Sequence, residues 1–158
     1  MTSSRIRPSC WFAFVLFAGS CLLPAPDAAG QPRGDINSPI DLVVLQCMMP
    51  AKVRLGAKFQ LVDEIENGGQ EAAPESIAIF YLSTDDVLDE KDLAIKGRRV
   101  PPLAPGRAHS QPTTMSIDFD VPPGEYYLII AADARRQVPE RIETNNTKAT
   151  RFTLLPRK

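Results

Sequence analysis

The sequence predicts an all-β protein, an antiparallel β-sandwich of about seven short strands. Apolar residues recur at every second position or in short continuous runs, which is the spacing of strands. Gly, Pro, Asn and Asp separate these runs, and no stretch shows the 3.6-residue stripe of an amphipathic helix. The 158 residues suffice for one domain, and short strands without helices pack as two layers.

The first 30 residues have the three parts of a secretory signal peptide: two arginines, an apolar run over residues 11–23, and small residues up to Gly30. The apolar run is too short for a transmembrane helix, which needs roughly 20 residues. We therefore expect cleavage near Gly30, no transmembrane span, and a secreted or periplasmic protein. A lipid anchor at Cys21 is the alternative, because residues 18–21 (AGSC) look like a lipoprotein box.

Charge and cysteine content limit the partners and the cysteine chemistry that we expect of the mature chain. Cleavage would remove two of the 18 basic and one of the 19 acidic side chains, leaving 16 and 18 and a net charge of −2. Such a chain is not drawn strongly to nucleic acid. Cys47 would be the single cysteine left, so no internal disulfide can form. We expect Cys47 to be a small buried hydrophobe rather than a catalytic thiol.

The domain is predicted to span residues 40–158, after a flexible polar leader over residues 31–39. The expected strands cover residues 40–46, 57–67, 76–82, 97–106, 113–122, 125–133 and 149–155.

The first three strands follow from alternation and turn residues. Residues 40–46 are almost wholly apolar, and in the second strand Phe59, Leu61 and Ile65 alternate with polar residues and should face inward. Asn67-Gly68-Gly69 is typical of a tight reversal, so the chain can return directly as the third strand. Residues 76–82 are apolar on both faces, which indicates a central strand.

The later strands are read from prolines and apolar runs. Prolines in 97–106 cannot donate to a ladder and mark an edge, while 113–122 places Met115, Ile117, Phe119 and Val121 on one face. Residues 125–133 form the most apolar run of the mature chain, and 149–155 would point Phe152 and Leu154 inward.

Gly124-Glu125-Tyr126 resembles the tyrosine corner of immunoglobulin-like sandwiches, in which the Tyr hydroxyl donates to an upstream carbonyl. This motif would place Tyr126, Leu128 and Ile130 in the core and makes the expected sandwich immunoglobulin-like.

An acidic loop follows the third strand and contains Asp85, Asp86, Asp89 and Asp92. Carboxylates are hard oxygen ligands, so these four residues are the candidate calcium site. The loop lacks the glycine and the final glutamate of an EF-hand, so the match is only chemical. The alternative is a solvated turn in which Asp85 or Asp92 accepts hydrogen bonds from backbone amides.

A second polar cluster lies between the last two strands and contains Asp133, Glu140, Glu143, Asn145 and Asn146. We expect these side chains to bind backbone amides of the loop. Immunoglobulin-like strand order would place the two polar loops at opposite ends of the sandwich, so they could not share one ion.

Candidates for catalysis are few. His109 is the single histidine and lies in a proline-rich stretch, which argues against a catalytic triad. Asp118 and Asp120 could form a carboxylate pair, yet their alternation with apolar residues indicates solvated strand decoration. The leading hypothesis is a non-catalytic module, without a cofactor, that binds a protein or polysaccharide. The alternative is a hydrolase or an accessory domain of a secreted enzyme complex.

Several of these motifs occur together in a fixed order. YLSTD at residues 81–85, Gly124-Glu125-Tyr126 and the E-x-x-E-x-N-N spacing of residues 140–146 are the most specific. Over residues 40–155 the chain resembles the CARDB family, the cell-adhesion-related domain of bacteria. The resemblance implies an immunoglobulin-like sandwich from a secreted or surface protein, a role like adhesion, and no catalytic activity.

Overall fold

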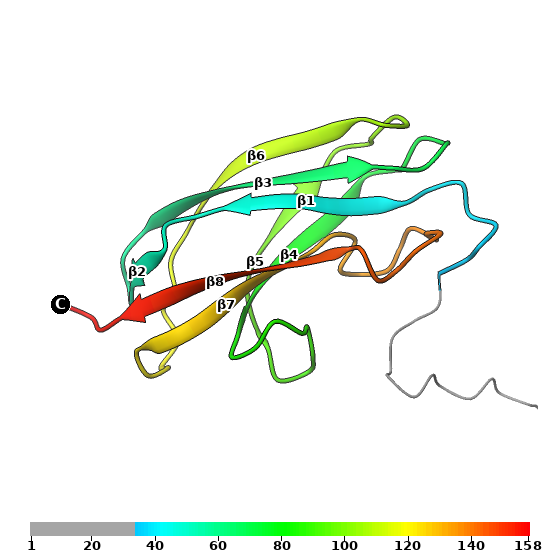
Figure 1. Ribbon diagram of the computed structural model, residues 1–158. Helices are drawn as coiled ribbons and strands as arrows, with labels where there is room; N and C mark the ends of the chain where they lie inside the picture. Colours follow the sequence, from blue (N-terminus) through cyan, green and yellow to red (C-terminus); the bar gives the residue numbers. More distant parts are fainter. Residues whose placement is uncertain (1–33) are drawn as a thin grey trace, which may run out of the picture.

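The computed structural model describes residues 34–158, and these form two packed β-sheets without a helix (Figure 1). The smaller sheet has the strand order β1 (Leu42–Met48), β3 (Phe59–Asn67), β6 (Ala108–Met115). The larger sheet has the order β2 (Lys52–Arg54), β8 (Thr147–Leu155), β7 (Gly124–Ala131), β4 (Ser76–Ser83), β5 (Leu93–Val100). The predicted β-sandwich is thus confirmed, with eight strands.

The predicted signal peptide and Cys21 lie outside the described residues. Within residues 34–158, no helix has the length and apolar character that crossing a membrane requires.

Alternating side chains close the core between the sheets. Leu61 and Ile65 of β3 face Phe80 of β4 and Leu128 of β7, and all four are at most 1% exposed. Each such side chain contributes about 1.5–3 kcal/mol when it is removed from water. Ile129 is also 1% exposed although it faces the other side of β7, so the second half of this strand is covered on both faces.

The tyrosine corner is confirmed. Tyr126 is buried in the core, and its hydroxyl donates to the carbonyl of Pro122 at 2.9 Å. Its ring lies 6.5 Å from that of Phe152, centroid to centroid, on the neighbouring strand β8.

The predicted strand over residues 113–122 is wrong in its extent. Strand β6 begins at Ala108 and ends at Met115, because the chain must then cross from the smaller sheet to the larger one to enter β7. Ile117 is fully buried in this crossing, and its carbonyl accepts from the backbone N–H of Gly56 at 2.9 Å. Pro112 fits inside β6 because β6 is an edge strand, paired only with β3.

The expected direct reversal at Asn67-Gly68-Gly69 is also wrong, since β3 and β4 belong to different sheets. Gly69 is needed for a close approach instead: a Cβ there would lie 2.2 Å from the carbonyl oxygen of Pro39. The Asn67 side chain is buried and donates to the carbonyls of Glu71 (2.7 Å) and Leu103 (2.9 Å). Asn67 and Gly69 therefore connect the end of β3 to the segments that contain Pro39, Glu71 and Leu103.

One end of the sandwich brings the segment before β1 against the loop between β7 and β8, drawn in cyan and orange in Figure 1. The backbone N–H of Asp35 donates to the carbonyl of Glu140 at 2.7 Å, and that of Arg141 to the carbonyl of Ile40 at 2.8 Å. The Ser38 hydroxyl donates to the carbonyl of Pro139 at 2.6 Å. The described part of the leader, from residue 34, is therefore hydrogen-bonded to the domain.

Candidate functional site

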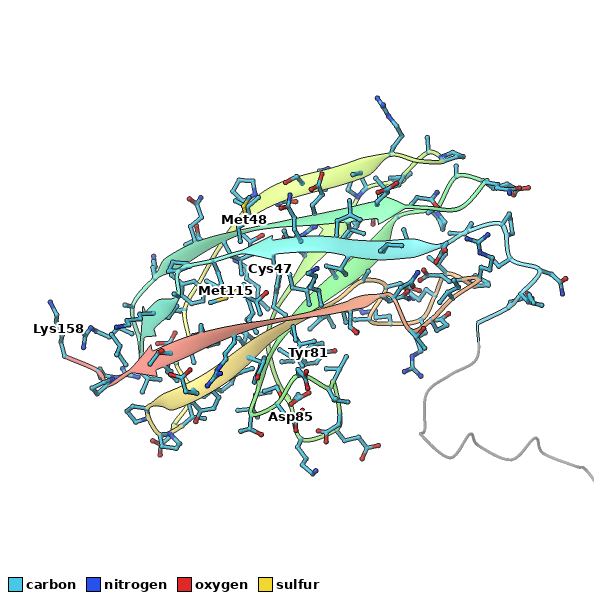
Figure 2. The ribbon with its side chains drawn as sticks, in the orientation of Figure 1. Cys47, Met48, Tyr81, Asp85, Met115 and Lys158 are labelled. Carbon is cyan, nitrogen blue, oxygen red and sulfur yellow. The ribbon has the colours of Figure 1, made fainter. Side chains whose placement is uncertain are left out.

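The acidic loop leaves the larger sheet between β4 and β5, on the side away from the smaller sheet, where Figure 2 labels Asp85. Asp85, Asp86 and Asp89 are exposed, and Asp92 is partly buried. Asp85 Oδ1 accepts from the N–H of Val87 at 3.0 Å, and Asp92 Oδ2 from that of Asp89 at 2.9 Å. The expected capping of backbone amides by Asp85 and Asp92 is confirmed.

Through these hydrogen bonds the aspartate side chains bind backbone N–H groups of their own loop. Asp89 accepts from the N–H of Lys91 at 2.7 Å, and this hydrogen bond lowers the Asp89 pKa. Within residues 34–158, no three His, Cys, Asp or Glu side chains form a group that could hold a metal ion. Calcium binding by Asp85, Asp86, Asp89 and Asp92 stays a prediction.

The second polar cluster is buried, and Glu140 is at its centre. Glu140 is 1% exposed; its Oε2 accepts from the N–H of Leu42 at 2.5 Å, and its Oε1 accepts from Asn146 Nδ2 at 3.0 Å. The side chain thus supplies the first residue of β1 with a hydrogen-bond partner that no strand provides there. We expected hydrogen bonds to backbone amides of the loop, and Glu140 instead binds an amide of β1.

Asp41 extends the cluster toward the surface. Its carboxylate accepts from Arg141 Nη2 at 3.0 Å and from Asn145 Nδ2 at 2.9 Å. Asp41 is buried, whereas the Arg141 side chain is 42% exposed, so the ion pair lies at the edge of the cluster.

Asp133 lies at the end of β7 with a positive φ of 37°. Its Oδ2 accepts from the N–H of Val138 at 2.7 Å. Asp133, Glu143 and Asn146 line a cavity of about 80 Å³ together with Tyr81 of β4 and Leu88 of the acidic loop. The two polar loops do leave opposite ends of the strands, but the acidic loop folds back far enough for Leu88 to reach this cavity.

Burial controls the protonation of the cluster. Burial is the largest cause that raises the pKa of Glu140 to about 8; the hydrogen bond from the Leu42 N–H acts to lower it, and the charges of Glu143, Asp133 and Asp41 act to raise it. Burial likewise raises the pKa values of Asp133 and Glu143. Several carboxylates therefore crowd together with little compensating positive charge.

The residues considered for catalysis differ in chemical type and lie in different parts of the fold. His109 lies on β6, and its Nε2 is 3.4 Å from Gln111 Oε1. Asp118 and Asp120 are exposed but lie in the crossing between β6 and β7 rather than on a strand. Burial raises the pKa of the Cys47 thiol to about 11, which disfavours the reactive thiolate.

A groove of about 520 Å³ lies between β5 and β6, the outer strands of the two sheets. Lys96 of β5 spans it by donating from Nζ to the carbonyl of Thr114 on β6 at 2.6 Å. Lys58 and Phe119 bring a charge and an aromatic ring to the lining, which also includes Asp118 but not His109.

Comparison with models of known protein families finds a match to CARDB over residues 38–150. The chain belongs to the CARDB family. The resemblance read from the motifs is thus confirmed. Comparison with curated protein sequences finds no match.

Solved structures share the fold of this CARDB domain. The CARDB domain from Pyrococcus furiosus, in complex with di-metal ions, is 18% identical, with a TM-score of 0.58 over 75% of this chain and 96% of that one. A domain of a predicted cell surface protein from Methanosarcina acetivorans is 20% identical, with a TM-score of 0.55 over 73% and 92%. A β-glucosidase from Listeria innocua is 11% identical, with a TM-score of 0.51 over 75% of this chain and 16% of the enzyme.

Sequence reasoning found the residues of both polar loops but missed the groove and the cavity. The groove combines Lys58, Lys96 and Phe119, which are distant in the sequence and lie outside any motif. The cavity depends on how the acidic loop folds over the sheet, which no local pattern indicates. Asp133, a polar residue that follows the apolar run of β7 directly, was the available signal.

Proposed function

We propose that this CARDB domain is a secreted, non-catalytic module that binds a protein or polysaccharide at the bacterial cell surface or in the periplasm. The groove between β5 and β6 is the observation that carries the proposal. Its volume of about 520 Å³ is in the range of ligand sites, roughly 300–1,000 Å³.

The chemistry of the groove suits an extended polar ligand. Lys58 and Lys96 can donate hydrogen bonds, Asp118 can accept them, and the Phe119 ring offers an apolar face. Both flanking strands are edge strands, whose outer backbone groups can pair with an extended peptide. Family membership and the surface protein from Methanosarcina acetivorans support the location.

Binding assays with a matched pair of variants test the proposal. Lys58→Glu reverses a charge in the groove, and Lys52→Glu makes the same change on β2, away from it. On a glycan array and in titrations with any protein captured from the native cell envelope, we expect Lys58→Glu to weaken binding at least about tenfold and Lys52→Glu to leave it unchanged. Equal binding by both variants would exclude the groove as the site.

The second candidate is an accessory domain of a secreted enzyme. The β-glucosidase match favours it, because there the same fold accounts for a small part of a catalytic chain. Turnover on glycosidase and peptidase substrate panels tests whether the domain is itself a hydrolase, which neither candidate requires. Activity that disappears in Asp118→Ala or His109→Ala would point to an enzyme and contradict the non-catalytic proposal.

A further inference from the structure

Two residues that line the small cavity beside the β7–β8 loop each have a buried side-chain oxygen without a hydrogen-bond partner among the described residues. These oxygens are Asp133 Oδ1 and Asn146 Oδ1, from side chains on residues that are 2% and 5% exposed. Both residues line the cavity. Buried hydrogen-bond acceptors in native proteins nearly always have a partner. Two unpartnered oxygens on residues that line one cavity therefore point to a bound hydrogen-bond donor or cation.

The other polar atoms of these side chains are already engaged. Asp133 Oδ2 accepts from the Val138 N–H, and Asn146 Nδ2 donates to Glu140 at 3.0 Å and to Glu143 at 3.4 Å. These bonds hold each side chain so that its unpartnered oxygen, Oδ1, cannot turn to another group without breaking one of them. The two free oxygens are therefore fixed features of the loop.

The charge around the cavity favours a cation. The carboxylates of Asp133 and Glu143 both line it, and Glu140 lies within hydrogen-bonding distance of Asn146. Arg136 lines it as well, but its side chain is exposed and has access to solvent. Burial raises the pKa values of Asp133 and Glu143, although the charge of Arg136 acts to lower that of Glu143.

We propose that this cavity is a calcium site, with the Asp133 and Glu143 carboxylates and the Asn146 carbonyl oxygen as ligands. Carboxylate and amide oxygens are the ligands that calcium takes, and the lining includes no histidine or cysteine that would favour zinc or copper. Calcium here would fix the β7–β8 loop onto the larger sheet.

Three variants of the full chain locate the ion. Asp133→Asn removes one ligand charge and keeps an acceptor for Val138, and asparagine tolerates the positive φ at this position. Glu143→Gln removes the second charge at a half-buried position. Asp120→Asn is the matched control, an exposed aspartate near the opposite end of β7. Asp89→Ala reports on the rival site in the acidic loop.

The measurement is calcium titration of EDTA-stripped protein, followed by melting temperature and calorimetry. We expect wild type, Asp120→Asn and Asp89→Ala to bind calcium with a dissociation constant on the order of 0.1–1 mM and to melt at higher temperature with 5 mM calcium. Asp133→Asn and Glu143→Gln should bind at least about tenfold more weakly while keeping the wild-type circular dichroism spectrum in EDTA.

Terbium, a luminescent calcium substitute, gives a second readout. Tyr81 lines the cavity, so terbium bound there should emit on tyrosine excitation, and Tyr81→Phe should reduce the emission while calcium still raises the melting temperature. A wild-type protein that does not respond to calcium overturns the proposal. So does a response that Asp133→Asn and Glu143→Gln retain, and loss in Asp89→Ala alone would assign the ion to the acidic loop.

Discussion

At the scale of single residues, Asp63 and Arg98 form an ion pair inside the sandwich. Asp63 is fully buried on β3, and Arg98 is 7% exposed on β5. Arg98 Nε donates to Asp63 Oδ1 at 3.1 Å and to Oδ2 at 3.0 Å, and Nη2 also donates to Oδ2. Because β3 and β5 belong to different sheets, the pair joins the two layers.

Replacing one residue of this pair should lower the free energy of unfolding far more than replacing both. Arg98→Met leaves the Asp63 carboxylate buried without a counter-charge, and we expect a loss of about 3–5 kcal/mol in the free energy of unfolding. The double variant Asp63→Leu/Arg98→Met should lose much less, because two apolar side chains replace two charges. Urea unfolding at pH 7 measures both. A double variant less stable than Arg98→Met would contradict this account of the pair.

The alternation of β3 places Leu61, Asp63 and Ile65 on one face, and the sequence therefore predicted the buried positions of Leu61 and Ile65 correctly. It left out Asp63, because a charged residue in inward register needs a partner before its burial can be expected. Arg98 is 35 residues away and on another sheet, and its position depends on how the sheets pack. Pairing across sheets has no local signal.

At the scale of elements, the tyrosine corner fixes the entry of the chain into β7. The Tyr126 hydroxyl donates to the carbonyl of Pro122, which lies near the end of the crossing between the sheets. The ring itself packs in the core. The hydrogen bond and the apolar contact can therefore be separated by substitution.

Tyr126→Phe should remove the hydrogen bond alone. We expect the free energy of unfolding to fall by about 0.5–1.5 kcal/mol, with more if the Pro122 carbonyl stays away from water. Tyr127→Phe is the control: it makes the same change at the next residue of β7, on the opposite face, and should cost less than about 0.5 kcal/mol. Equal losses in the two variants, measured by thermal and urea unfolding, would show that the corner adds no stability.

Strands with strong alternation or continuous apolar runs were predictable, and β3, β4, β7 and β8 lie close to their expected ranges. β2 has three residues and one buried side chain, Val53, which is too little for a pattern. β6 reads AHSQPTTM, and its polar composition reflects an edge strand with one solvated face. Apolar alternation continues past Met115 because the crossing is buried, which is why the sequence suggested a strand there.

At the scale of the whole molecule, buried carboxylates join the beginning of the domain to its last loop. Glu140 binds the Leu42 N–H of β1 and the Asn146 side chain before β8. Charging Glu140 opposes this arrangement, because burial and the neighbouring Glu143, Asp133 and Asp41 favour the protonated form. The stability of the whole domain should therefore depend on pH through this end.

The direction follows from linkage between protonation and folding. The Glu140 pKa rises from 4.5 to about 8 on folding, so its contribution to stability is complete below pH 4.5 and is lost as pH increases through about 8. One pKa unit corresponds to about 1.4 kcal/mol, and a loss on the order of 3 kcal/mol is expected between pH 5 and pH 8. The raised pKa values of Asp133 and Glu143 act in the same direction.

Urea unfolding in EDTA, which removes any cation effect, should show this decline in stability for the wild type. Glu140→Gln cannot ionise, and rotation of the Asn146 amide preserves its hydrogen bond. Its stability should therefore change less across this range and exceed that of the wild type at pH 8. Parallel profiles for the two proteins would show that Glu140 is not the group that couples pH to folding.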